Sequence, residues 1–343
     1  MTAEEFTIGI LFPFREKSLI LENLCRNFPI KLITTPYLES YELRSSRGLH
    51  KGRNEQGIPE PLIEPSLAEQ WVECNALVGM DIPSNPEMLF PNLKWFQGVS
   101  AGYDHIDSAA LKAMGVTQTN ARGISSPAIS EFIFARVLQI WKDLRLLDSQ
   151  QEDRLWKVQF GTQAHGKTMG IVGLGSIGRE VAVKARAFGM KVLATRKSAV
   201  AGDSDPDVDE LFPVQGLPEL LPRCDVVVMT APSTEDTKDI FDSSMFALMK
   251  KGSIFCNIAR GIHVVESALV DALEKGHLGA AILDVTREEP LPNDHPLWMA
   301  PNLFLSPHCS ISFDTYEQNA AQLIADNAKR YLAGEKLKNV VSD

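Results

Sequence analysis

The stretch KTMGIVGLGSIGREVAVKARAFG, residues 167–189, decides the fold class of this chain. It predicts a buried strand and then a helix, separated by glycines in the spacing G-x-G-x-x-G. The first glycine permits a tight turn, the second lets the backbone approach a diphosphate, and the third lets helix and strand pack closely. The free N–H groups at the start of a helix also attract anions. The pattern therefore predicts a dinucleotide-binding turn formed by Gly173, Gly175, Ser176, Ile177 and Gly178.

Apolar segments that alternate with helical segments continue on both sides of this turn. After it, strands are predicted at 191–195, 225–230, 252–258, 279–285 and 302–307. Before it, a shorter series predicts strands at 6–12, 30–35, 75–80 and 93–99, with a helix at 18–28. Alternation of this kind is typical of doubly wound parallel sheets.

The two series predict an α/β fold made of two doubly wound domains, which a chain of 343 residues is long enough to build. A Rossmann dinucleotide-binding domain, residues 123–309, is expected to be inserted into a flavodoxin-like substrate domain, residues 1–122 and 310–343. The insertion is expected because the last predicted helix, about 314–333, returns to the first series.

Two further segments are conspicuous in the sequence. Residues 37–65 are polar and rich in Gly, Pro and charge, so we interpret them mostly as a surface excursion. Residues 129–147 predict the clearest helix, with an apolar stripe at helical spacing. The stripe is Ile129, Phe132, Ile133, Val137, Ile140, Trp141, Leu144 and Leu147. Core packing and a subunit interface both explain it, and the sequence leaves the choice open.

Composition and charge exclude several classes of binding partner. The formal net charge is −10, which argues against nucleic acid and anionic membranes as main partners. Five cysteines without a CxxC pair fit a reducing compartment and give no zinc motif or other metal motif. The start of the sequence lacks the basic and apolar regions of a signal peptide, and no apolar run reaches the roughly 20 residues that span a bilayer. We therefore expect a cytoplasmic protein.

The segment KVLATRKSAV, residues 191–200, bears on the choice of dinucleotide. About twenty residues after the glycines, many dinucleotide-binding units place an acid on the ribose hydroxyls. This chain has Thr195, Arg196, Lys197 and Ser198 instead. Without an acid a 2′-phosphate is not repelled, and Arg and Lys attract it. We predict a preference for NADP(H), with NAD(H) left open; a solvated basic loop is the alternative explanation.

Five motifs, in order along the chain, resemble those of the D-isomer-specific 2-hydroxyacid dehydrogenases. They are VSAGYDHID (99–107), GKTMGIVGLGSIG (166–178), NIARG (257–261), LDVTREEPLP (283–292) and PLWMAPNLFLSPHCS (296–310). The resemblance covers about residues 70–315. It implies an NAD(P)-dependent oxidoreductase that exchanges a hydride with a small 2-keto or 2-hydroxy acid.

The resemblance assigns catalytic roles to Arg260, Glu289 and His308. When a 2-keto acid is reduced, the carbonyl oxygen needs a proton, which His308 can give near neutral pH. Glu289 would bond the other ring nitrogen, and Arg260 would bind the substrate's carboxylate or carbonyl oxygen. Any one of the three alone could be an ordinary loop or strand-end residue; the argument rests on the set.

The resemblance also implies contacts with substrate and cofactor. Backbone N–H groups of Ser100, Ala101 and Gly102 are expected to hold the substrate carboxylate. Asp284 matches a position that bonds the nicotinamide amide, although a strand-end acid that caps local backbone is the alternative. The remaining cofactor contacts are expected at Ala231, Pro232 and Ile258.

Glyoxylate and hydroxypyruvate are the expected substrates, by family analogy. Pro307 stands where formate dehydrogenases place Gln, so formate is disfavoured, and Cys309 is expected to be a pocket-lining thiol. A homodimer through 129–147 is implied by the family. A dinucleotide-sensing corepressor-like binding protein of the same fold and a Rossmann methyltransferase are the alternatives.

Overall fold

The computed structural model describes residues 5–15 and 19–341. The predicted helix at 18–28 therefore begins outside the described residues, at Ser18. The chain divides into two compact units: unit 1, residues 1–124 and 313–343, and unit 2, residues 125–312. The sequence placed these boundaries at 122/123 and 309/310. Each unit is described by itself below.

Unit 2 is built on seven parallel strands in the order β12-β11-β10-β9-β6-β7-β8. The strands are β6 (Thr168–Val172), β7 (Lys191–Thr195), β8 (Glu210–Phe212), β9 (Val226–Met229), β10 (Ile254–Asn257), β11 (Ala280–Leu283) and β12 (Leu303–Leu305). The strand order reverses between β6 and β9, and ligands of such sheets bind outside the carboxyl ends of the strands at that point. The glycine turn follows β6 directly.

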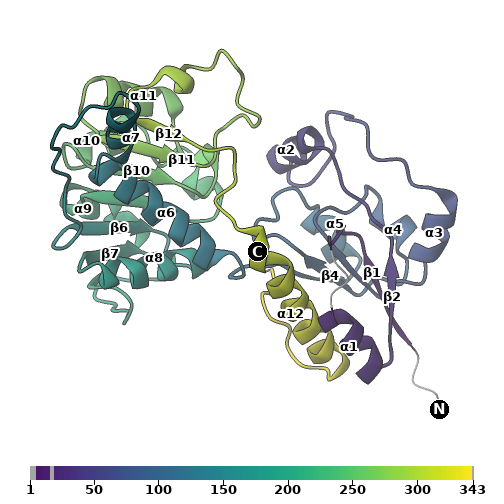
Figure 1. Ribbon diagram of the computed structural model, residues 1–343. Coiled ribbons are helices and arrows are strands. Elements are labelled where there is room, and N and C mark those ends of the chain that lie inside the picture. Colours follow the sequence, from purple (N-terminus) through teal and green to yellow (C-terminus); the bar gives the residue numbers. More distant parts are fainter. Residues whose placement is uncertain (1–4, 16–18, 342–343) are drawn as a thin grey trace. The chain divides into compact units, whose positions relative to one another are not determined.

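Helices cover both faces of this sheet (Figure 1). One face is covered by α6 (Ser126–Trp141) and α8 (Ser176–Ala187), and the other by α9 (Leu217–Leu220), α10 (Ser243–Leu248) and α11 (Glu266–Glu274). Along β9, Val226 and Val228 belong to the first core and Val227 and Met229 to the second. Because both faces are buried, these strands are continuous apolar runs rather than alternating ones. This sheet with helices on both faces is the predicted Rossmann fold.

The prediction of one helix over 129–147 is wrong, because the chain forms two helices. The first, α6, ends at Trp141, and α7 runs over Leu144–Glu152. Between them Asp143 has a left-handed backbone with φ of 51°. The stripe on α6 is core, since Ile129, Ile133 and Val137 pack with the residues of α8 and the sheet. The apolar residues of α7 are exposed instead.

Unit 1 holds five parallel strands in the order β2-β1-β3-β4-β5, which is the flavodoxin-like order. They are β1 (Phe6–Ile10), β2 (Ile30–Thr34), β3 (Ala76–Gly79), β4 (Trp95–Gly98) and β5 (Thr117–Thr119). The helices α1 (Leu19–Asn27) and α12 (Phe313–Leu332) lie side by side on one face (Figure 1). The other face is covered by α3 (Pro65–Trp71), α4 (Pro86–Leu89) and α5 (Ser108–Ala113).

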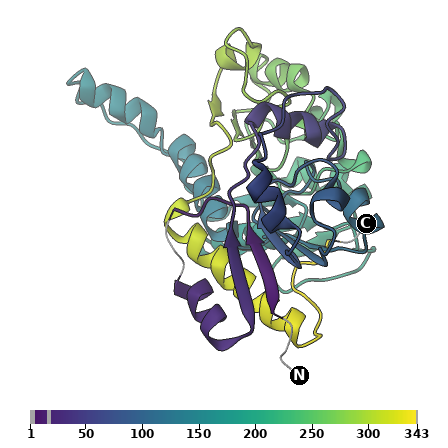
Figure 2. The same ribbon diagram turned by 90° about the vertical axis from the view of Figure 1, so that its right-hand side faces the viewer.

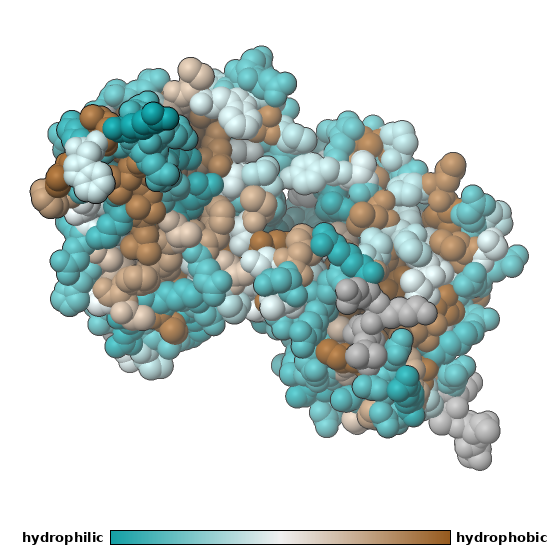
Figure 3. All heavy atoms as spheres, in the orientation of Figure 1, coloured by the Kyte–Doolittle hydropathy of each residue, from teal (hydrophilic) through white to brown (hydrophobic). Residues whose placement is uncertain are grey.

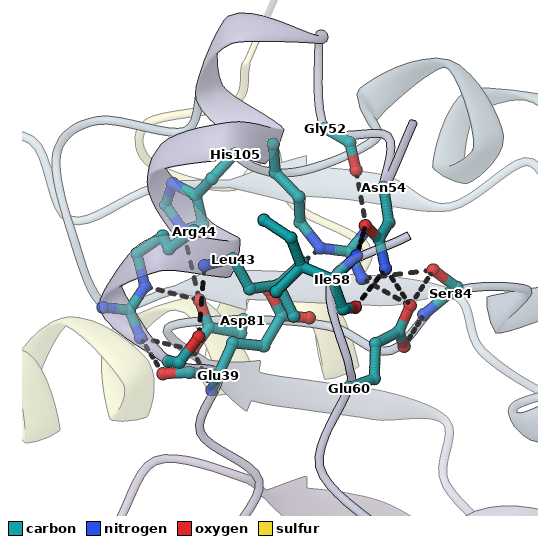
Figure 4. Close-up of polar contacts among 12 residues, drawn as sticks. Glu39, Leu43, Arg44, Gly52, Asn54, Ile58, Glu60, Asp81, Ser84 and His105 are labelled. Carbon is teal, nitrogen blue, oxygen red and sulfur yellow. Dashed lines mark hydrogen bonds and ion pairs between the residues drawn. The ribbon is translucent and has the colours of Figure 1, made fainter. Parts of the chain in front are cut away.

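The interpretation of 37–65 as mostly a surface excursion is wrong for its first part, which folds as α2 (Tyr41–Leu49). Ser40 caps this helix by accepting a hydrogen bond from the Leu43 N–H at 3.1 Å. On its inner side Glu39 and Arg47 are each only 4% exposed, and their Oε2 and Nε lie 2.9 Å apart. Figure 4 shows the polar network to which Glu39 belongs. A segment rich in charged residues is usually predicted to be exposed, but a charged side chain can be buried when it pairs with one of opposite charge.

No helix within residues 5–15 and 19–341 combines the length and the apolar character that a membrane span requires.

Candidate active site

The predicted site residues of unit 2 all follow the carboxyl ends of its strands. Because the strands are parallel, these ends meet along one edge of the sheet. In chain order the edge carries Gly173 after β6, Thr195 at the end of β7, Ala231 and Pro232 after β9, Ile258 and Arg260 after β10, Asp284 after β11, and His308 after β12. Four of the five sequence motifs are therefore brought together within unit 2, and the fifth, residues 99–107, belongs to unit 1.

At two positions of the glycine turn, neighbouring atoms of the chain leave no room for a side chain. Gly173 has a φ of 104°, and a Cβ there would lie 2.6 Å from the Cα of Ala231. A Cβ on Gly178 would lie 2.6 Å from the carbonyl oxygen of Gly173. Gly175 differs, because an added Cβ would meet no atom of the described residues within 4 Å. The space next to Gly175 is open for a ligand to approach the backbone.

The first turn of α8 is suited to an anion. Gly175 is its N-cap residue and has no side chain, so no side-chain hydrogen bond closes the helix end. The N–H groups of Ser176, Ile177 and Gly178 open the helix, where the partial positive charge of the helix dipole is concentrated. With the open space at Gly175, this arrangement fits the diphosphate of a dinucleotide.

Thr195 is part of the turn's framework. Its Oγ1 accepts a hydrogen bond from the Gly173 N–H at 3.2 Å, and its carbonyl oxygen accepts one from the Leu174 N–H at 2.8 Å. The side chain is buried. Thr195 therefore fixes the glycine turn against β7, and it leaves no acid at the end of that strand.

The basic residues after β7 have partners within the chain. Arg196 Nη1 lies 2.7 Å from Asp205 Oδ2. Lys197 is 79% exposed, with its Nζ 3.6 Å from Asp236 Oδ2, and Ser198 is exposed. The residues predicted to attract a 2′-phosphate thus follow β7 directly, but the guanidinium group of Arg196 is already paired with the carboxylate of Asp205.

His308 and Glu289 form a direct pair. The His308 Nδ1 lies 2.9 Å from Glu289 Oε2, and the other carboxylate oxygen accepts a hydrogen bond from the Thr286 N–H at 2.9 Å. This pairing leaves Nε2 of the imidazole for a proton transfer, and the ring is about half exposed. Geometrically, the pair can act as an oriented acid and base.

Asp284 holds the loop that carries His308. Its carboxylate is 1% exposed and accepts hydrogen bonds from the Ser306 Oγ at 2.6 Å and from the N–H groups of Cys309 at 3.0 Å and Ser310 at 3.1 Å. Its carbonyl oxygen accepts the His308 N–H at 2.8 Å. This geometry favours the alternative in which Asp284 caps local backbone, so it positions His308.

The Arg260 loop is ordered by Asn257, a residue of the NIARG motif for which the sequence predicted no role. The buried Asn257 amide donates to the Arg260 carbonyl oxygen at 2.8 Å and accepts the Ala259 N–H at 3.0 Å. Arg260 Nη1 donates to the Ala259 carbonyl oxygen at 2.7 Å. A Cβ on the following Gly261 would lie 2.0 Å from the carbonyl carbon of Thr286. The Arg260 loop therefore presses against the loop that leads to Glu289.

The predicted substrate loop belongs to unit 1 and follows β4. The Asn120 Nδ2 donates to the Ala101 carbonyl oxygen at 2.8 Å, and the Ala121 N–H donates to that of Ser100 at 2.9 Å. The Ser100 hydroxyl donates to the Gly102 carbonyl oxygen. With their carbonyls held, the N–H groups of residues 100–102 have no acceptor among the described residues.

Cys309, beside His308, is not prepared as a nucleophile. Burial, and then the charge of Asp284, raise the pKa of its thiol, which favours the unreactive protonated form. Within the described part of the chain, no group of three or more His, Cys, Asp or Glu residues is arranged to hold a metal ion.

Comparison with known proteins identifies the family to which the chain belongs. Residues 134–310 match the family model described as "D-isomer specific 2-hydroxyacid dehydrogenase, NAD binding domain". The chain is 33% identical over 296 residues to glyoxylate/hydroxypyruvate reductase B of Citrobacter koseri, covering 82% of this chain and 90% of that protein.

Two solved structures share the fold. A D-isomer specific 2-hydroxyacid dehydrogenase family protein from Aeromonas salmonicida superposes with a TM-score of 0.76 at 29% identity, covering 98% of this chain and 99% of that one. An NADPH-dependent glyoxylate/hydroxypyruvate reductase from Sinorhizobium meliloti, solved with NADP and sulfate, gives a TM-score of 0.72 at 24% identity, covering 98% of each. The predicted resemblance is confirmed: the chain belongs to the D-isomer specific 2-hydroxyacid dehydrogenase family and is an oxidoreductase of that family.

Proposed function

We propose that this protein reduces small 2-keto acids, glyoxylate and hydroxypyruvate foremost, to 2-hydroxy acids with NADPH. The observation that carries the proposal is the His308–Glu289 pair at 2.9 Å, on the same edge of the sheet as the uncapped glycine turn. The choice of substrate is supported by relatives such as the Citrobacter koseri protein, which is named glyoxylate/hydroxypyruvate reductase B.

Each catalytic side chain has a role that follows from its contacts. A nicotinamide bound at this edge of the sheet would supply the hydride for the keto carbon. His308 donates the proton from Nε2 to the carbonyl oxygen, while Glu289 at Nδ1 fixes the ring and stabilises its charged form. Arg260 binds the substrate carboxylate or the carbonyl oxygen and stabilises the negative charge that develops there.

A separate part of the proposal concerns unit 1 by itself. We propose that the N–H groups of Ser100, Ala101 and Gly102 bind a carboxylate of the substrate, since the carbonyls of these residues are held by the chain's own hydrogen bonds. Successive backbone N–H groups of this kind form an anion-binding turn.

Preference for NADP(H) is the finer part of the proposal. Residues 195–198, at the end of β7 and directly after it, include no acid that would repel a 2′-phosphate, and the positive charges of Arg196 and Lys197 support the preference. In steady-state assays with hydroxypyruvate, kcat/KM for NADPH is expected to exceed that for NADH. Equal or better use of NADH would contradict the preference, and dinucleotide binding without turnover of any 2-keto acid would favour the sensor-like alternative.

We further propose a homodimer, formed by the arm of residues 144–160 rather than by 129–141. Trp156 is 99% and Phe160 is 88% exposed on this arm, whereas the stripe of α6 packs on the core and is buried or half-buried. Figure 2 shows α7 extending away from the sheet of unit 2, and in Figure 3 hydrophobic side chains gather at the α7 corner. Exposed apolar patches of this kind mark association surfaces.

Sedimentation tests the dimer. The wild-type protein is expected to sediment as a dimer, and the double variant Trp156→Ser, Phe160→Ser as a monomer with unchanged circular dichroism. The matched control Val200→Ser, another exposed apolar position of unit 2, should leave the dimer intact. A monomeric wild-type protein would contradict the proposal.

We also propose that the protein works in the cytoplasm. Its five cysteines, none in a disulfide, fit a reducing compartment of this kind.

A further inference from the structure

Four charged residues of unit 2 form one ion-pair group beside the end of β7. The group, called the Asp205 cluster here, consists of Arg179, Arg196, Asp205 and Asp207. Asp205 accepts two hydrogen bonds from Arg179, at 3.0 and 2.8 Å, and one from Arg196 Nη1 at 2.7 Å. Asp207 accepts from Arg179 and has no bond to Arg196. Arg179 belongs to α8, the helix that begins at the glycine turn.

The charges of the Asp205 cluster cancel, because two guanidinium groups face two carboxylates. The Asp205 carboxylate is 6% exposed, so solvent screens it little. Hydrogen bonds from Arg179, with that from Arg196 adding to them, lower the pKa of Asp205 to about 2. Asp205 is therefore ionised throughout the neutral range, and Arg196 adds no net positive charge to its surroundings.

Arg196 is held by more than the ion pair. Its backbone N–H donates to the Phe212 carbonyl oxygen at 3.0 Å, and its carbonyl oxygen accepts the Ala199 N–H at 3.0 Å. Its Nε is buried and has no hydrogen-bond partner among the described residues. A phosphate that approaches the end of β7 thus meets a guanidinium whose Nη1 is bound to a carboxylate and whose Nε is unused.

We propose that Asp205 sets the cofactor selectivity of this protein by competing with the ribose 2′-phosphate for Arg196. The inference rests on the proposed function, in which Arg196 contacts that phosphate. Asp205 acts through Arg196 and is a positioning residue. NADH has no 2′-phosphate, so its binding does not compete with Asp205 for Arg196. The ratio of NADPH affinity to NADH affinity therefore measures the effect of this competition. In the wild-type protein the preference for NADPH is smaller than Arg196 and Lys197 alone would produce.

The test is Asp205→Asn, which removes the charge and keeps an oxygen that can accept from Arg179. Kd values for NADPH and NADH are measured by nicotinamide fluorescence, and kcat/KM for both with hydroxypyruvate. The ratio of NADPH to NADH affinity is expected to rise roughly tenfold, which is less than the full interaction of one unit charge near a protein surface because Asp207 and Arg179 remain. The affinity for NADH should stay within about twofold, because nothing in NADH competes for Arg196.

The matched control is Asp207→Asn, which removes the same charge from a carboxylate that does not bond Arg196. In Asp207→Asn, the ratio of NADPH affinity to NADH affinity should rise much less than in Asp205→Asn. In the double variant Arg196→Gln, Asp205→Asn, the gain should disappear. Should Asp205→Asn not fold, Asp205→Ser removes the carboxylate with a smaller side chain, and the same gain is expected.

An unchanged or lower ratio in the Asp205 variant would overturn the inference, and so would an equal rise in Asp207→Asn, since that would be a general charge effect. The proposed function is judged separately, by the wild-type ratio. A wild-type protein that prefers NADH would contradict the proposed NADP(H) preference, and the shift between wild type and variant would still test Asp205.

Discussion

Replacing His308 by Ala is expected to lower kcat for glyoxylate or hydroxypyruvate by about 10²–10⁴-fold, the usual contribution of a positioned general acid. The Kd for NADPH should stay within about twofold, because the glycine turn that we propose for the cofactor is formed by β6 and α8. The cause is the loss of the imidazole whose Nδ1 pairs with Glu289 at 2.9 Å. Steady-state kinetics and nicotinamide fluorescence measure the two quantities.

Two variants make this result specific to His308. Glu289→Gln keeps an acceptor for Nδ1 but removes the charge that stabilises the protonated ring, so a smaller loss of kcat than in His308→Ala is expected. The neighbouring Cys309→Ser should stay close to wild type, since the thiol takes no part in the proposed chemistry. A His308→Ala protein with wild-type kcat would remove His308 from the mechanism.

Replacing Arg47 by Met is expected to lower the free energy of unfolding of unit 1 by about 3–5 kcal/mol, the usual cost of breaking a buried ion pair. Arg47 lies 2.9 Å from Glu39 and 3.1 Å from Glu60, and it donates to the Gly52 carbonyl oxygen at 2.8 Å. Met has a similar length but satisfies none of these oxygens. Chemical denaturation followed by Trp fluorescence reports on unit 1 through the buried Trp71 and Trp95.

The loss should depend on pH, because burial raises the pKa of Glu39 to about 7 while Arg47 opposes that rise. A carboxyl whose pKa is higher in the folded protein binds its proton more tightly there, so its contribution to stability is lost as pH rises from the unfolded value through the folded one. Without Arg47, ionised Glu39 has lost its counter-charge. The Arg47→Met loss should thus be larger near pH 8, above the folded pKa of Glu39, than near pH 5, where Glu39 in the folded protein is protonated.

The control for this experiment is Arg53→Met, an exposed guanidinium of the same segment, which should cost less than about 1 kcal/mol. Glu39→Gln removes the titrating group and should flatten the stability curve between these two pH values. An Arg47→Met loss as small as that of the control, or one that is independent of pH, would show that the buried network does not stabilise unit 1.

Much of the fold was predictable because buried parallel strands leave a strong pattern in the sequence. The apolar runs that became β6, β9, β10 and β11 need no tertiary information to be recognised. The three-residue edge strand β8 left too short a run to be seen. The end of α6 was missed because the apolar spacing continues past Asp143, and a single residue in the left-handed conformation interrupts the helix without changing that spacing.

The candidate site was predictable as a set of motifs but not as a set of contacts. His308 and Glu289 are 19 residues apart in sequence, and only the family pattern associated them. The three hydrogen bonds of the Asp284 carboxylate depend on how the loop after β12 folds back. The pairing of Arg196 with Asp205 likewise depends on a loop whose course a charge pattern does not give. Buried ion pairs such as Glu39 with Arg47 are hidden for the same reason, since charge by itself predicts exposure.

The central claim, reduction of a 2-keto acid by hydride transfer with His308 as the acid, is tested most directly by following the hydride. Wild-type protein is incubated with glyoxylate and NADPH that carries deuterium at C4 of the nicotinamide, and the product is analysed by mass spectrometry and NMR. The account predicts glycolate with deuterium at C2, formed by the wild-type protein and nearly absent with His308→Ala. Bound NADPH with no labelled 2-hydroxy acid from glyoxylate or hydroxypyruvate would contradict it.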